Sequence, residues 1–190
     1  VAGLDGDDLI FGDAGTDEVY GGEGNDRIFG GADDDRLWGD AGNDTIHGND
    51  GDDVIVGGIS ANDVDPNKLY GGAGNDTLEG GDGADEIHGG TGNDDISGGA
   101  QDDTLYGAGG DDTFVLEDGM GNDTISGGET SEVNGDVIDA SALTGDVTLD
   151  LATLQNTNPE MGTLSVDGDT VAFEQIETVI LGSGDDSIIG

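Results

Sequence analysis

The chain has 190 residues, 45 Asp and Glu against 3 Lys and Arg, 40 glycines and a formal net charge of −42. Only 32% of residues are hydrophobic and no cysteine is present. The charge excludes nucleic acid and anionic membranes as partners, and the missing cysteines exclude disulfides and thiol chemistry. No apolar run approaches the roughly 20 residues of a membrane span, and Val1 does not begin a signal peptide. Low hydrophobicity with high charge favours disorder, unless a cation folds the chain.

A nine-residue repeat runs from Gly3 to Ser126, and Gly21–Phe29 (GGEGNDRIF) is a clean unit. The sixth position of successive units holds an acidic residue: Asp8, Asp17, Asp26, Asp35, Asp44, Asp53, Asp76, Asp85, Asp94, Asp103, Asp112 and Asp123, with Asn67 in the one irregular unit. The eighth position is always apolar: Ile10, Val19, Ile28, Leu37, Ile46, Ile55, Leu69, Leu78, Ile87, Ile96, Leu105, Phe114 and Ile125. So regular a pattern predicts a structural repeat rather than a disordered chain.

Each unit predicts a turn followed by a short strand. The first six residues, rich in Gly, Asn and Asp, favour a turn, and the last three favour a strand whose eighth position faces a core. One unit buries a single aliphatic side chain, so two units would form an 18-residue coil and the coils would stack. We therefore expect an all-β fold, a right-handed parallel β-roll of stacked coils.

Stacked coils place the sixth-position aspartates in two rows, one along each edge of the roll. Each gap between turns would then present carboxylates together with backbone carbonyls from the fourth position. Those carbonyls belong to Gly6, Gly15, Gly24, Gly42, Gly51, Gly74, Gly83, Gly92 and Gly110. Calcium takes six to eight such hard oxygens, whereas magnesium demands a tighter octahedron. We predict about ten Ca²⁺ ions on these aspartates and carbonyls, with the calcium concentration acting as a folding switch.

The repeat G-G-x-G-x-D-x-U-x resembles the RTX (hemolysin-type) family of calcium-binding nonapeptide repeats. Departures occur where Asp33 and Gln101 replace the fourth-position glycine, and where Leu4, Asp13, Asp40 and Asn49 replace the second. We expect these turns to be weaker. The resemblance implies a secreted protein that crosses the cell envelope through a type I secretion apparatus and folds outside in calcium.

Two segments interrupt the pattern. An insertion loop at about residues 59–67 lengthens one unit, and its Asp63, Asp65 and Asn67 alternate like the start of an EF-hand. Lys68 and Gly74 occupy the slots of the EF-hand glycine and glutamate, so an EF-hand is rejected, although an irregular calcium site remains an alternative to a plain polar turn.

Residues 127–181 form the second interruption, which we expect to be a β-rich flank that caps or widens the roll after the repeats of residues 1–126. Strand-like runs lie at 147–151, 163–166, 170–173 and 178–181, and Asp167-Gly168 predicts a hairpin turn. The apolar residues of this flank are Leu143, Leu149, Leu151, Leu154, Leu164, Val166, Val171, Phe173, Ile176, Val179 and Leu181.

Asp136 is a candidate metal ligand in a degenerate unit within this flank. Residues 182–190 restart the repeat, with Asp186 as a further candidate ligand. The chain begins and ends inside a motif, so we expect an internal fragment of a longer protein whose neighbouring domains contact the roll.

Aromatic residues occupy several outward ninth positions, among them Phe11, Tyr20, Phe29 and Trp38. They would stack at 18-residue spacing, either to cover the strands or to bind carbohydrate. His47 and His88 share this position, but they lie in separate stretches and do not suggest a zinc pair. The chain contains no HExxH or GxSxG motif, and a carboxylate that recurs in every unit is unlike an active site.

The sequence therefore predicts a non-enzymatic, extracellular calcium-binding module. The alternatives are a calcium-stabilised carbohydrate-binding or adhesion module, and the non-catalytic part of a secreted protease, lipase or alginate epimerase.

Overall fold

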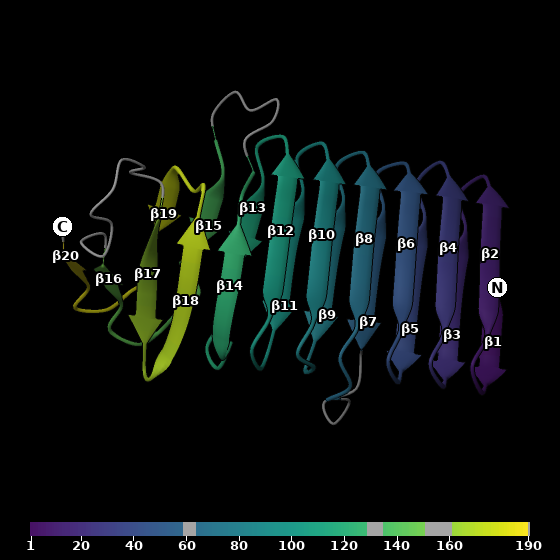
Figure 1. Cartoon of the computed structure of the whole chain (residues 1–190), viewed down its shortest axis with the longest axis horizontal. Coiled ribbons are helices and arrows are strands. Elements are labelled where there is room, and N and C mark those ends of the chain that lie inside the picture. Colours follow the sequence, from purple (N-terminus) through teal and green to yellow (C-terminus); the bar gives the residue numbers. More distant parts are fainter. Residues whose placement is uncertain (59–63, 129–134, 151–160, 190) are drawn as a thin grey trace.

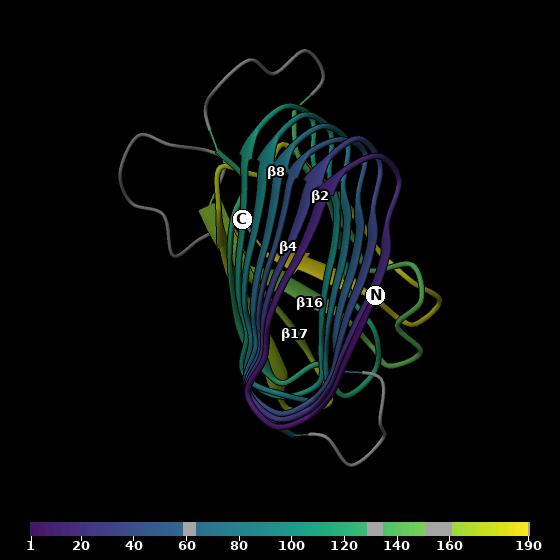
Figure 2. The ribbon, with the colours of Figure 1, turned by 90° about the vertical axis from the view of Figure 1, so that its right-hand side faces the viewer.

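The computed structural model describes residues 1–58, 64–128, 135–150 and 161–189. In these residues the chain is all-β: two sheets lie face to face and extend along one axis, with the termini at opposite ends (Figure 1). Viewed toward the end of this axis, the successive coils superpose as a flattened ring (Figure 2). The predicted parallel β-roll is confirmed. No helix in the described part of the chain is long and apolar enough to cross a membrane.

The first sheet has nine strands, all of them odd-numbered. In spatial order they are β1 (Ala2–Asp5), β3 (Glu18–Glu23), β5 (Arg36–Ala41), β7 (Val54–Gly58), β9 (Thr77–Gly81), β11 (Asp95–Gly99), β13 (Thr113–Val115), β15 (Val137–Asp139) and β19 (Thr178–Ile180). Each strand pairs in parallel with the next, so this sheet continues from the repeats into the flank.

The second sheet begins with β2 (Leu9–Ala14), β4 (Arg27–Ala32), β6 (Thr45–Asp50), β8 (Lys68–Ala73), β10 (Glu86–Thr91), β12 (Thr104–Gly109) and β14 (Asn122–Ser126). It continues with β18 (Asp169–Glu174), β17 (Met161–Val166), β16 (Thr148–Asp150) and β20 (Ser187–Ile189). In the repeats the register follows the coil length: Ile10 lies beside Ile28, and Ile28 beside Ile46.

The insertion leaves this register intact. Thr45 pairs with Lys68 and Val54 with Thr77, each 23 residues apart, after which Lys68 pairs with Glu86 at the regular spacing of 18. The five extra residues therefore fall between β7 and β8, and residues 59–63 of the predicted insertion loop lie outside the described residues.

The strands are longer than predicted. In a typical unit they cover the seventh to ninth positions and continue through the first three positions of the next unit, as in β4, so only three residues remain for the turn. The expectation of six turn residues and three strand residues was wrong. Glycines at the first two positions still join the strands, because a parallel neighbour on each side supplies backbone hydrogen-bond partners. The low strand propensity of glycine does not take these partners into account.

The core of the repeats consists of two rows of side chains, one from each sheet, that meet between the sheets. All thirteen predicted eighth-position residues are buried, and Ile28, Leu37 and Ile46 are completely inaccessible to solvent. In the flank, Leu143, Leu149, Leu164, Val166, Val171, Phe173 and Ile176 are buried, and Val179 and Leu181 pack against them. Leu151 and Leu154 lie outside the described residues.

The flank contains the predicted hairpin. β17 and β18 pair antiparallel with Val166 opposite Asp169, and Asp167 and Gly168 between them have φ values of 51° and 107°. Positive φ at both central residues is typical of a type I′ turn. The predicted strand-like runs correspond to β16, β17, β18 and β19.

The backbone keeps a positive φ even where the repeat lacks glycine. Leu4, Asp13, Asp40, Asn49 and Ala108 have φ between 73° and 106° at the second position. At the fourth position, Asp33 has φ 80° and Gln101 has φ 75°. A residue with a Cβ is strained in this region, which supports the expectation of weaker turns.

We predict that Ala108→Gly stabilises the protein by about 1 kcal/mol, because it relieves left-handed strain without removing a charge. The matched variant Ala73→Gly, at a position outside this φ region, should instead cost about 0.5–1 kcal/mol. Urea unfolding at saturating calcium measures both changes. A loss of stability in Ala108→Gly would show that the strain is absent.

Candidate metal centres

The sixth-position residues stack in two columns, one at each edge of the roll. The first-edge column contains Asp8, Asp26, Asp44, Asn67, Asp85, Asp103 and Asp123, and the second-edge column contains Asp17, Asp35, Asp53, Asp76, Asp94, Asp112 and Asp136. Asp8 and Asp17 of the first coil are partly buried, and the others are at most 4% exposed.

From the second coil onward, one side-chain oxygen of each column member accepts a backbone amide of the preceding coil. Asp26 Oδ1 accepts the amide N–H of Asp8 at 2.8 Å, and Asp44 Oδ1 accepts that of Asp26 at 2.8 Å. The same bond recurs between all neighbours in both columns, with lengths of 2.6–3.0 Å. Each aspartate thereby fixes the turn of the preceding coil.

The second carboxylate oxygen, Oδ2, is buried in most of these aspartates. Within the described residues, Oδ2 has no hydrogen-bond partner in Asp26, Asp35, Asp53, Asp76, Asp94, Asp103 and Asp112. An unpaired buried carboxylate oxygen is costly unless a positive charge compensates it. A row of such atoms is the arrangement expected around bound cations.

First-position glycines leave room for these oxygens. A Cβ on Gly21 would lie 2.4 Å from Asp26 Oδ2 and 2.5 Å from the carbonyl oxygen of Gly39, so both oxygens approach the same side of Gly21. Gly39 has the same relation to Asp44 and to Gly57. A side chain at this position would displace the two oxygens.

Carbonyls of the fourth position also face the gaps between coils. A Cβ on Gly42 would lie 2.1 Å from the oxygen of Gly24, and one on Gly110 would lie 2.0 Å from that of Gly92. The same close approach to the preceding coil occurs at Gly24, Gly51, Gly74, Gly83 and Gly92. Gly6 and Gly15 lie in the first coil, and a Cβ there would meet nothing within 4 Å.

This donor set fits calcium. Ca²⁺ binds six to eight hard oxygen ligands, and carboxylate and carbonyl oxygens are ligands of this kind. The described part of the chain has no group of three or more His, Asp or Glu side chains placed to hold a metal ion. A cation in a gap would therefore need backbone carbonyls beside the stacked carboxylates.

The fifth positions form a ladder of their own, which the sequence analysis did not predict. Asn43 N donates to Asn25 Oδ1 at 2.9 Å, and Asn25 N donates to Asp7 Oδ1 at 2.9 Å. Similar bonds connect Asp34 with Asp52, Asp52 with Asn75, Asn75 with Asn93, Asn93 with Asp111, and Asp102 with Asn122. Where both ladders are present, a turn is linked to its neighbours by two sets of side-chain bonds that run in opposite directions.

The flank ends the two columns differently. On the second edge Asp136 N donates to Glu177 Oε2 at 2.6 Å, so Glu177 continues the column. Sequence reasoning missed Glu177 because no glycine-rich turn precedes it, although the following Thr178 and Val179 match the strand pattern. On the first edge Val171 pairs with Asp123, and this buried apolar side chain ends the column.

The last turn repeats the column geometry. Asp186 Oδ1 accepts the Val147 amide at 3.1 Å, and Asp146 Oδ1 accepts that of Asp185 at 3.0 Å. Val147 stands where the repeats have aspartate, so this gap has one sixth-position carboxylate. In the insertion, Asp63 lies outside the described residues, whereas the Asp65 carbonyl oxygen accepts Asn67 Nδ2 at 3.3 Å.

Burial raises the pKa of the column carboxyls. Desolvation is the largest cause, neighbouring carboxylates add to it, and the backbone hydrogen bond opposes it. The pKa rises to about 6 for Asp53, Asp76 and Asp112, to about 7 for Asp94 and Asp123, and to about 8 for Asp103. Without a cation these sites therefore favour protons.

The outward aromatic rings form a ladder on the second sheet. Phe11, Phe29, His47, Tyr70, His88 and Tyr106 stack in this order, with centroids 4.6–5.2 Å apart. Tyr20 and Trp38 stack on the other sheet at 4.7 Å. The two histidines thus share one column, separated by Tyr70, rather than lying in unrelated stretches. The inner rings cover one another's faces, which supports a role in covering the sheet.

The family comparison agrees with the repeat pattern of this site. A family profile described as "RTX calcium-binding nonapeptide repeat (4 copies)" matches residues 1–28, 29–64, 65–96, 88–119 and 115–130. No curated protein sequence matches the chain. Among solved structures, the extracellular lipase LipA from Serratia marcescens is similar, with 17% sequence identity and a TM-score of 0.34. The similarity covers 82% of this chain, which spans 38% of the lipase chain.

We predict that low pH partly replaces calcium. A carboxyl whose pKa is raised by folding stabilises the fold fully below its ordinary value of 3.8, and this stabilisation is lost as the pH rises through about 6 to 8. In calcium-free buffer the β signal in circular dichroism should therefore grow as the pH falls from 8 to 5.5. Asp103→Asn should weaken this dependence, and a β signal independent of pH would contradict the prediction.

Proposed function

Because the chain belongs to the RTX family of calcium-binding nonapeptide repeats, we propose that it is a structural module that folds when it meets calcium outside the cell. The observation that carries the proposal is the row of buried Oδ2 atoms without hydrogen-bond partners. A chain of net charge −42 that stacks carboxylates in two columns needs cations between its coils.

We assign the metal ligands to the sixth-position aspartates and the fourth-position carbonyls. Oδ1 holds the turn of the preceding coil, Oδ2 faces the gap, and the carbonyl oxygens approach from the neighbouring turns. Bound calcium supplies the positive charge that these oxygens lack. In this assignment the backbone sets the spacing of the gap and the aspartates supply the negative charge.

The expected free energies of calcium binding support a calcium-dependent folding switch. Extracellular calcium modules have Kd values of about 10⁻⁴–10⁻³ M. At Kd near 10⁻⁴ M, millimolar calcium stabilises the folded state by about 1.5 kcal/mol per site, and submicromolar calcium contributes almost nothing. About ten sites would together supply about 15 kcal/mol, similar to the whole stability of an ordinary domain.

Secretion follows from the same switch. A chain that stays unfolded at the low calcium level of the cytoplasm can pass through a narrow type I channel, then fold in millimolar calcium. Family membership supports this route, and we place the module in a larger extracellular protein.

We predict that the chain is disordered in chelator and gains β structure cooperatively in millimolar calcium. Circular dichroism during a calcium titration measures this change. Magnesium at equal concentration should largely fail, because it resists losing its water ligands. A well-formed β spectrum in chelator at pH 7.5 would refute the proposal.

The ligand assignment predicts different outcomes for two neighbouring substitutions. Asp26→Ala should lower the number of bound calcium ions by one or two, because Asp26 lies between two gaps: its carboxylate accepts the Asp8 amide of the preceding coil, and its own amide donates to Asp44 Oδ1 of the next coil. Ile28→Ala should destabilise by about 2–5 kcal/mol through a cavity but keep the full number at saturation. Calorimetry combined with atomic absorption counts the ions, and an unchanged count for Asp26→Ala would show that the assigned ligand is wrong.

A further inference from the structure

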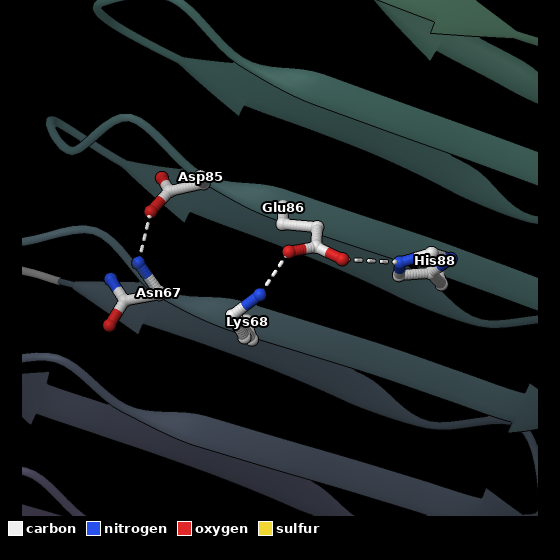
Figure 3. Close-up of polar contacts among 5 residues, drawn as sticks. All are labelled: Asn67, Lys68, Asp85, Glu86 and His88. Atoms are coloured by element: carbon white, nitrogen blue, oxygen red, sulfur yellow. Dashed lines mark hydrogen bonds and ion pairs between the residues drawn. The ribbon is translucent and has the colours of Figure 1, made fainter.

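Asn67 is the one amide in the first-edge column. It lies in the column like its neighbours: it is 2% exposed, its Oδ1 accepts the Asp44 amide at 2.9 Å, and its own amide donates to Asp85 Oδ1 at 2.6 Å. Figure 3 shows the bond to Asp85 at the turn, with Lys68 reaching Glu86 on the outer surface. The hydrogen bonds that connect neighbouring turns of the column are therefore unbroken at Asn67.

The Asp44 bond fixes the orientation of the Asn67 amide. A backbone N–H needs an acceptor, so Oδ1 faces Asp44 and Nδ2 takes the place that Oδ2 has in the aspartates. The glycines beside the two residues show this equivalence. A Cβ on Gly57 would lie 2.8 Å from Asn67 Nδ2 and 2.5 Å from Gly80 O, just as a Cβ on Gly21 would lie 2.4 Å from Asp26 Oδ2 and 2.5 Å from Gly39 O.

The amide also uses a neighbouring carbonyl of the gap. Nδ2 donates to Asp65 O at 3.3 Å. Asp65 stands in the fourth-position slot, since a Cβ on Gly83 in the next coil would lie 2.2 Å from this same oxygen. A donor N–H thus faces the oxygen that elsewhere in the roll is available to a cation, and an NH₂ group cannot itself ligate one.

The second ladder is interrupted at the same place. Pro66, in the fifth position, has no amide N–H to donate to Asn43 and no side-chain acceptor, and Ala84 in the next coil has no side-chain acceptor either. On the opposite edge the same ladder continues through Asn75 and Asn93. The fifth-position ladder and the sixth-position carboxylate are therefore both missing at this edge of the coil.

We propose that Asn67 takes the place of a calcium ligand with a hydrogen-bonded amide. The first-edge column then binds calcium in two separate runs, Asp8–Asp44 and Asp85–Asp123, and the second-edge column binds it continuously. This inference rests on the proposed calcium function. The Asn67–Asp65 hydrogen bond then closes this turn without an ion.

The test uses two opposite substitutions in this column, asparagine to aspartate and aspartate to asparagine. Asn67→Asp restores the carboxylate in the interrupted slot, and the matched variant Asp26→Asn creates the same interruption at an equivalent, equally buried position of this column. Both substitutions keep the side-chain shape and the Oδ1 acceptor. Equilibrium dialysis at saturating calcium, followed by atomic absorption, counts the ions bound by wild type and by each variant.

We expect Asn67→Asp to bind at least one ion more than wild type, and Asp26→Asn at least one fewer. An unchanged count in a folded Asn67→Asp, or an undiminished count in Asp26→Asn, would overturn the inference, because either result shows that an amide at the sixth position does not prevent binding. If Asn67→Asp does not fold, the Asp26→Asn count still decides. Failure of the proposed function is distinguishable, since wild type itself would then bind no calcium.

Discussion

The burial of carboxylates at a fixed spacing is the constraint on which the rest of this structure depends. All repeat coils but the one with Asn67 place an aspartate at both edges, and from the second coil onward its Oδ1 holds the turn of the coil before it. The same stacking brings like charges together and removes water from Oδ2. The stacked aspartates therefore hold the turns through Oδ1. Through the buried Oδ2 they destabilise the same turns until a cation is bound.

Glycine makes this arrangement sterically feasible. At the first position there is no space for a Cβ between the carboxylate and the carbonyl of the next coil, and at fourth positions such as Gly42 and Gly110 a Cβ would meet the carbonyl oxygen of the preceding turn. The thin core follows from the same geometry, because one aliphatic side chain per half coil is all that the narrow space between the sheets admits. Limited hydrophobic burial is the reason that stability must come from the edges of the roll.

The ends of the repeat show how apolar packing replaces ionic chemistry. Val171 follows Asp123 in the first-edge column and Val147 stands beside Asp186, each a buried aliphatic residue in an aspartate slot. The antiparallel strands β16, β17 and β18 supply a wider core in this region, so its turns depend less on charge. Asn67 likewise puts an uncharged side chain in an aspartate slot inside the repeat. There a hydrogen bond, rather than an apolar contact, holds the side chain.

The sequence by itself determined the nine-residue period, the core residues from Ile10 to Ile125, the acidic columns and the Asp167-Gly168 hairpin, because these depend on local periodicity and on turn chemistry. It did not determine the strand lengths, since glycines join a strand only when parallel neighbours supply hydrogen bonds. Only the tertiary structure showed that Glu177 extends one column, because its coil neighbour Asp136 is 41 residues away. The direction of the Asn67 amide is likewise set by Asp44, which is distant in sequence and adjacent only after the coils stack.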